Sequence, residues 1–170
     1  MARRLAVVAL ALVVGSGAGC ARALYNFGEI ESGVLYRSAQ PSPLFLRYLV
    51  ARHGVRSLVN LRGRTPGFES RFAAEHGLRL FSFDMSASRA PTQAQVDRFL
   101  EIVADEANHP ILVHCRNGVD RTGYMVGIVR LQQGWTPAQV TREMNRFLQF
   151  SVLNAAPQKV ITETARSPSE

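Results

Sequence analysis

The sequence predicts an α/β fold, a three-layer sandwich in which a mainly parallel central sheet is flanked by helices. Short apolar runs suited to strands alternate with segments whose apolar residues recur at helical spacing. This alternation favours a parallel sheet, because two parallel strands need a crossover that is usually a helix. Apolar residues make up 46% of the 170 residues, which is enough for one domain with its own core.

The first predicted elements are a strand and a helix. After a lead-in over residues 24–32, the run at 34–37 predicts a strand, and residues 41–53 predict a helix that ends at Gly54. The apolar residues with helical spacing in that helix are Leu44, Phe45, Tyr48 and Leu49. Residues 55–61 then predict a second strand, which turn-forming residues interrupt.

The remaining elements continue the alternation. Residues 68–76 predict a short helix, residues 78–83 a strand, and residues 92–107 a longer helix capped by Thr92. One face of that longer helix carries Val96, Phe99, Leu100 and Val103. The run at 110–113 predicts the central buried strand. Two final helices are predicted over residues 124–133 and 137–147.

The chain divides into a targeting segment (1–23), a single domain (24–155) and a C-terminal tail (156–170). A charged start, an apolar run over residues 5–14 and a stretch of small residues give the targeting segment the three-part pattern of a secretory signal. Three alternatives stay open: cleavage before Cys20 as in a lipoprotein, cleavage after Ala23, or an uncleaved membrane anchor. All three predict a domain outside the cytoplasm, whether periplasmic, membrane-anchored or secreted.

Residues 114–123, His-Cys-Arg-Asn-Gly-Val-Asp-Arg-Thr-Gly, carry the chemistry. Cys115 follows the buried strand, and Arg121 stands where the next helix begins. Backbone N–H groups of the loop and of the helix N-terminus converge on one point and favour negative charge there. That field favours a thiolate, and the planar guanidinium of Arg121 matches phosphate geometry. A thiolate beside a phosphate cradle predicts phosphoryl transfer through a cysteinyl-phosphate.

Three neighbours support this interpretation. Gly118 lets the backbone turn toward a ligand without a Cβ clash. Thr122 supplies a hydroxyl to hydrogen-bond the thiolate, and His114 is expected to orient the cysteine. Cys115 is the only thiol of the predicted domain, so no disulfide forms within it. The four histidines are dispersed, so we expect neither a metal site nor a cofactor.

The decapeptide resembles the signature loop of the cysteine-dependent protein tyrosine phosphatase superfamily, and its position two-thirds along the chain suits the dual-specificity type. Residues 26–27, 33–41 and 58–62 also look like the atypical dual-specificity phosphatases of the plant-and-fungal type, which have bacterial relatives. The similarity covers residues 26–150. It implies a dual-specificity phosphatase-like fold without added regulatory domains.

We predict Cys115 as the nucleophile and Arg121 as the clamp on the phosphoryl oxygens. The backbone amides that complete the cradle belong to Arg116, Asn117, Gly118, Val119, Asp120 and Arg121. The general acid is open: Asp84 follows the strand at 78–83, near the place of the family's mobile acid loop, whereas Asp120 lies in the signature loop itself. A reaction without a dedicated aspartate is the third alternative.

The resemblance supports the reaction better than the substrate. Phosphotyrosine and other phosphoproteins are the first expectation, inositol phosphates and phosphoinositides the alternative, and a phosphate-binding module without activity the non-enzymatic alternative. The net charge of +7 suits phosphate-bearing ligands. The basic residues are scattered and do not interleave with aromatic ones, so nucleic acid is not an expected partner. Membrane attachment through residues 1–23 is expected for two of the three processing alternatives, and the sequence leaves the oligomeric state open.

Overall fold

The computed structural model describes residues 23–147 and contains one five-stranded sheet. The strands are β1 (Gly28–Glu31), β2 (Leu35–Ser38), β3 (Ser57–Asn60), β4 (Arg79–Ser82) and β5 (Ile111–His114). Their order across the sheet is β1-β2-β5-β3-β4, and only β1 runs antiparallel to its neighbour. The prediction of a mainly parallel sheet is confirmed.

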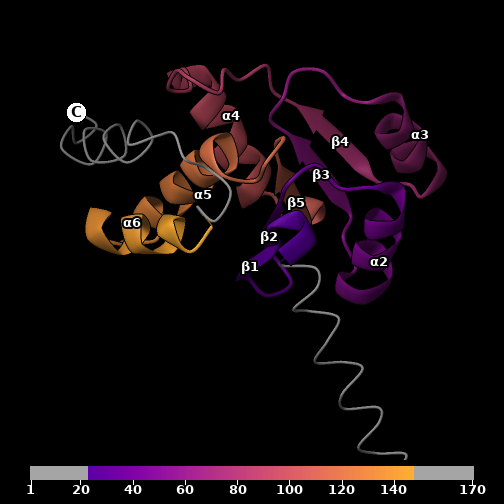
Figure 1. Cartoon of the computed structure of the whole chain (residues 1–170), viewed down its shortest axis with the longest axis horizontal. Coiled ribbons are helices and arrows are strands. Elements are labelled where there is room, and N and C mark those ends of the chain that lie inside the picture. Colours follow the sequence, from indigo (N-terminus) through magenta and orange to yellow (C-terminus); the bar gives the residue numbers. More distant parts are fainter. Residues whose placement is uncertain (1–22, 148–170) are drawn as a thin grey trace, which may run out of the picture.

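Helices cover both faces of this sheet (Figure 1). They are α2 (Pro43–His53), α3 (Gly67–Glu75), α4 (Gln93–Ala104), the short 3₁₀ helix η1 (Glu106–Asn108), α5 (Asp120–Gln132) and α6 (Pro137–Asn145). The central strand β5 contributes side chains to the core on both faces of the sheet, because successive side chains of a strand point to opposite faces. Leu112 packs in the cluster with α2 and α3, while Val113 packs in the cluster with α4 and α5. The three-layer sandwich is therefore confirmed.

Local signals set most helix starts. The hydroxyls of Ser42, Thr92 and Thr136 accept a backbone N–H from the first turn of α2, α4 and α6, and the last two form complete capping boxes. Gly54 ends α2 in the left-handed conformation, with φ of +64°. The predicted cap at Thr92 and the predicted stop at Gly54 are both confirmed.

Most boundaries differ from the sequence prediction by one to three residues, and three differences have a clear physical reason. Strand β1 lies inside the predicted lead-in, because only Ile30 of its four residues is buried and no alternation marks it. Helix α4 ends at Ala104, where the Asp105 carboxylate accepts the N–H of Ala107 and starts the 3₁₀ helix η1. Helix α5 begins at Asp120 rather than at 124, because its first turn is polar and gives no apolar periodicity.

The parallel register brings the site together at one edge of the sheet. Ser38 of β2 and Asn60 of β3 both pair with His114, the last residue of β5. The residues that follow these strands therefore meet at the carboxyl edge, where open α/β sheets bind ligands. Within residues 23–147, no helix combines the length and the apolar character needed to span a membrane.

Candidate active site

Cys115 lies directly after β5 and is 2% exposed. The chain then passes through a loop of four residues, 116–119, and enters α5 at Asp120. Unlike α2, α4 and α6, this helix has no side-chain cap, because its N-cap residue is Val119. Its first backbone N–H groups are thus left for a ligand, and the partial positive charge of the helix end favours an anion.

Gly118 is the residue on which the shape of the loop depends. Its φ is +66°, and a Cβ there would lie 2.6 Å from both the Ala39 nitrogen and the Ser38 carbonyl carbon. Real Cβ atoms do not approach backbone atoms so closely. The loop therefore packs against the end of β2 in a way that only glycine permits.

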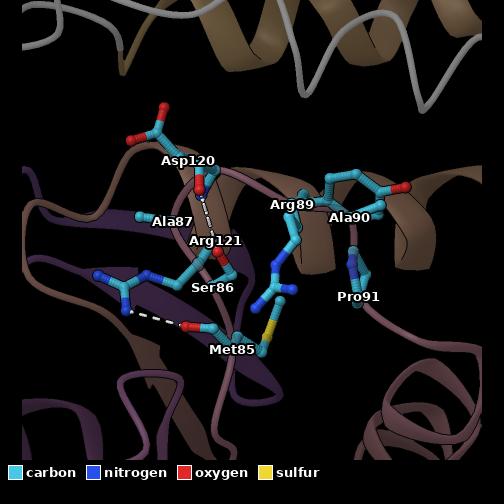
Figure 2. Close-up of a pocket in the computed structure, with 10 residues that line it drawn as sticks. Met85, Ser86, Ala87, Arg89, Ala90, Pro91, Asp120 and Arg121 are labelled. Carbon is cyan, nitrogen blue, oxygen red and sulfur yellow. Dashed lines mark hydrogen bonds between the residues drawn. The ribbon is translucent and has the colours of Figure 1, made fainter.

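Arg121, in the first turn of α5, extends across the carboxyl ends of the sheet. Its Nη1 donates to the Met85 carbonyl at 3.3 Å and lies 3.5 Å from the Leu61 carbonyl (Figure 2). Its Nε is buried and has no hydrogen-bond partner among the described residues. The guanidinium is thus held in place by backbone carbonyls, with donor capacity left for an anion.

Thr122 is fully buried one residue further along, and its hydroxyl also has no hydrogen-bond partner among the described residues. The side chains of Arg116 and Asn117 are exposed, whereas Gly118 and Val119 are buried. The loop therefore offers its backbone inward and its two polar side chains outward.

His114 is held by a residue that the sequence analysis did not identify. Its Nε2 lies 2.8 Å from Oε1 of Glu69 on α3, and both side chains are fully buried. The other carboxylate oxygen of Glu69 accepts the Gln40 amide at 2.8 Å, and Arg62 donates to that amide's oxygen at 2.7 Å. One polar network thus joins β5, α3 and the segments after β2 and β3.

Burial by itself would raise the pKa of Glu69, but the hydrogen bonds from His114 and Gln40 and the nearby charge of Arg62 outweigh it. The net effect is a pKa below the ordinary value. The signal for Glu69 was present in the sequence. An acidic residue three and four positions before Phe72 and Ala73, both buried, lies on the apolar face of a helix.

The two candidate acids lie in different surroundings. Asp84 is exposed, and its backbone forms an isolated antiparallel β-bridge with that of Arg62. Its carboxylate lies where a side chain at Gly63 would begin. Asp120 lines a small, open pocket together with Arg121, and Asp84 does not line that pocket. Residues 85–91, among them Arg89, form one wall of the pocket (Figure 2). Of the two aspartates, Asp120 is thus the one that shares this pocket with Arg121.

No cluster of three potential metal ligands occurs among residues 23–147. The donors that converge at this site are backbone amides and a guanidinium, which suit an anion and not a cation.

Comparison with known proteins agrees with this geometry. A family model described as the tyrosine phosphatase family matches residues 23–164. The inositol diphosphatase DSP1 of Oryza sativa subsp. japonica is 35% identical over 127 residues, which are 72% of this chain and 56% of that protein. The inositol diphosphatase SIW14 of Saccharomyces cerevisiae is 32% identical over 141 residues, which are 80% of this chain and 50% of that protein. The chain thus spans little more than half the length of these curated relatives.

Solved structures share the fold. The core catalytic domain of the PP-IP phosphatase SIW14 from S. cerevisiae, in complex with citrate, superposes with a TM-score of 0.73 at 30% identity. The match covers 83% of this chain and 89% of that one. TpbA of P. aeruginosa gives a TM-score of 0.65 at 22% identity, with 85% of this chain and 86% of that one covered. The second match shows a common fold alone.

Proposed function

The chain belongs to the tyrosine phosphatase family, and from this premise we propose that it hydrolyses phosphate esters or anhydrides through a cysteinyl-phosphate intermediate. The observation that carries the proposal is the arrangement of Cys115 directly after β5, joined by the loop 116–119 to the uncapped N-terminus of α5, with Arg121 in the first turn of that helix. A nucleophile, an anion cradle and a cationic clamp then act on one phosphoryl group.

In the first proposed step, the Cys115 thiolate attacks phosphorus in line. The Sγ–P bond forms while the P–O bond to the leaving group breaks. Arg121 and the loop amides stabilise the charge on the equatorial oxygens. In the second step, water attacks phosphorus, the Sγ–P bond breaks, and inorganic phosphate leaves with the thiolate restored.

We assign the proton transfers to Asp120. It donates to the leaving oxygen in the first step and accepts the proton of the attacking water in the second. Its place in the pocket beside Arg121 supports this role, whereas the Asp84 carboxylate lies against Gly63.

We propose an inositol diphosphate as the substrate in preference to a phosphoprotein. The relatives described above are inositol diphosphatases, which supports this assignment. Two arginines, Arg89 and Arg121, line the pocket, and the exposed Arg116 belongs to the loop that precedes α5. Such a concentration of positive charge suits a polyanion that carries phosphates beyond the one being cleaved.

The experiment is phosphate release by the purified full chain under reducing conditions with chelator present. The substrates are a diphosphoinositol polyphosphate, inositol hexakisphosphate, a phosphotyrosine peptide, a phosphoserine peptide, a phosphoinositide and para-nitrophenyl phosphate, with Cys115→Ser as the control. Cysteine-dependent release with preference for the diphosphate supports both proposals. Preference for the phosphotyrosine peptide overturns the substrate assignment but keeps the reaction. No release from any substrate by folded, reduced protein overturns the reaction and favours the phosphate-binding alternative.

We also propose that residues 1–23 direct export, as the three-part pattern in the sequence suggests. Residues 1–22 lie outside the part of the chain that the structure describes. The test is the mass of the mature N-terminus after expression of the full chain in a bacterium. A lipid-modified Cys20 would support membrane attachment, and a start at Leu24 would support release after cleavage. An intact Met1 in a soluble fraction would overturn export.

A further inference from the structure

Three successive carbonyl groups of the loop are held by donors from the N-terminal part of the domain. The Arg116 carbonyl accepts the backbone N–H of Gln40 at 3.1 Å. The Asn117 carbonyl accepts Nδ2 of Asn26 at 3.2 Å. The Gly118 carbonyl accepts both Nδ2 of Asn26, at 3.2 Å, and Nη2 of Arg37, at 2.6 Å. Every carbonyl between the nucleophile and the helix cap is therefore bound on the same outer side.

These bonds fix the direction of the N–H groups on the other side of the loop. In a trans peptide the C=O of one residue and the N–H of the next point in opposite directions. All three peptide bonds are trans, since the single cis bond among the described residues is His109–Pro110. Holding the carbonyls outward therefore turns the N–H groups of the following residues inward. Those residues are Asn117, Gly118 and Val119.

Arg37 is unusual for a residue in the interior strand β2. Its side chain is fully buried, and no carboxylate lies within salt-bridge distance of it among the described residues. Its Nη2 binds the loop, its guanidinium lies 3.9 Å from the centre of the Phe147 ring, and Nε and Nη1 have no hydrogen-bond partner among the described residues. Burying such a group is costly, so its contact with the loop calls for a reason.

The charge of Arg37 is matched to the nucleophile. Burial lowers the pKa of Arg37 to about 10, and the negative charge of Cys115, followed by that of Glu143, partly offsets this lowering. The same side chain thus contacts the loop and contributes positive potential behind it.

Asn26 donates to the loop on the same side as Arg37, since both bind the Gly118 carbonyl. It is 5% exposed and has a φ of +49°, a left-handed conformation that asparagine adopts more readily than most residues. The two N–H groups of its amide are shared among three carbonyls, the third being that of Phe147 at 3.0 Å, so one side chain ties the loop to the residues that follow α6. Neither its burial nor its backbone conformation is needed for β1 pairing, which begins at Gly28.

We propose that Asn26 and Arg37 are positioning residues for the anion cradle: they hold the Asn117 and Gly118 carbonyls outward so that the N–H groups of the loop point at the phosphoryl oxygens. This inference rests on the proposed function, because it assigns the cradle to a phosphoryl group. It concerns affinity for the anion itself and is therefore measurable without turnover.

The test is the dissociation constant for inorganic tungstate, measured by calorimetry on the full chain, together with kcat and KM for para-nitrophenyl phosphate. The variants are Asn26→Gly, which keeps the left-handed backbone but lacks the amide, Arg37→Met, and their combination. Each single variant is expected to weaken tungstate binding by about tenfold, the effect of one hydrogen bond to a charged group. The combined variant is expected to weaken tungstate binding by less than the product of the two single-variant factors, because both residues act on the Gly118 peptide. Arg37→Lys is expected to recover part of the affinity.

Arg130 provides a matched control. It also donates to a backbone carbonyl, that of Ile30 at 2.8 Å, and its guanidinium also lies over an aromatic ring, that of Trp135 at 4.3 Å. Arg130 differs from Arg37 in that it also pairs with Glu143 at 2.8 Å. Its hydrogen-bond partners Ile30, Gln133 and Glu143 all lie outside the loop 116–119, so Arg130→Met is expected to lower thermal stability and leave tungstate binding unchanged.

Unchanged tungstate affinity in folded Asn26→Gly and Arg37→Met would overturn the inference, as would an equal loss in Arg130→Met or full additivity in the combined variant. If Arg37→Met does not fold, Arg37→Gln takes its place. Weakened tungstate binding in a protein without cysteine-dependent turnover would sustain this inference and overturn only the proposed reaction.

Discussion

Replacing Gly118 by alanine probes the contact between the loop and the end of β2. Two costs combine at this position. The backbone conformation at φ of +66° costs an alanine about 1–2 kcal/mol. The new Cβ would also lie 2.6 Å from backbone atoms of Ser38 and Ala39, and relieving such overpacking costs about 1–3 kcal/mol. We expect the free energy of unfolding to fall by about 3 kcal/mol.

Gly134 separates the two costs. It has a φ of +82°, but a Cβ there would meet no atom within 4 Å. Gly134→Ala should therefore cost only the conformational part, about 1–2 kcal/mol. Urea denaturation of the wild type and the two variants, followed by circular dichroism, measures both losses with the same protein and probe.

The difference between the losses of unfolding free energy in the two variants gives the cost of the steric clash at Gly118. Gly118→Ala is also expected to weaken tungstate binding, because the loop must move away from β2 to admit the methyl group, whereas Gly134→Ala leaves that affinity unchanged. Equal losses of unfolding free energy in both variants would refute the claim that the loop is pressed against the strand end.

Three further predictions concern the chemistry and the buried network. Cys115→Ser should abolish turnover yet still bind substrate, which substrate trapping with calorimetry checks; turnover at the wild-type rate would contradict the covalent intermediate. Asp120→Asn should lower kcat on an alkyl phosphate by about 100-fold or more and on a diphosphate much less, because phosphate leaves without needing a proton; Asp84→Asn is the matched control, and the reverse pattern would transfer the role to it. Glu69→Gln should destabilise the protein at pH 7 by removing the carboxylate partner of His114. Since the pKa of Glu69 is lowered by folding, its contribution is present above the ordinary value of 4.5 and is lost as pH falls through the folded value. Urea midpoints of wild type and variant should therefore approach each other as the pH falls below 4.5, and a gap that widens as the pH falls would contradict this account.

The fold was largely accessible from the sequence, because its signals are local. The hydroxyl caps of α4 and α6, the glycine that ends α2 and the apolar runs of β3 and β5 each act within a few residues. The first strand and the first turn of α5 were not identified, for opposite reasons. Too few residues of β1 are buried to give an alternation of apolar and polar residues in the sequence. The first turn of α5 is polar because we expect it to bind a ligand and not to pack in the core, so it shows no apolar periodicity.

The sequence by itself determined the reacting segment. Cys115, Gly118, Arg121 and Thr122 lie within eight residues, so one strand, one loop and one helix start suffice to bring them together. Their roles follow from chemistry that a short segment can express: a thiolate, a left-handed turn and a guanidinium at a helix N-terminus.

Only the tertiary structure decided what supports that segment. Glu69 is 45 residues from His114, Arg37 is 81 residues from Gly118, and Asn26 is 92 residues from it. No periodicity or spacing along the chain encodes these contacts, because they arise from the register in which β2 and β3 flank β5. The same register places Asp120 in the pocket and leaves Asp84 outside it. A buried charge is tolerable only where specific partners are already in place, and those partners are set by the packing of distant segments.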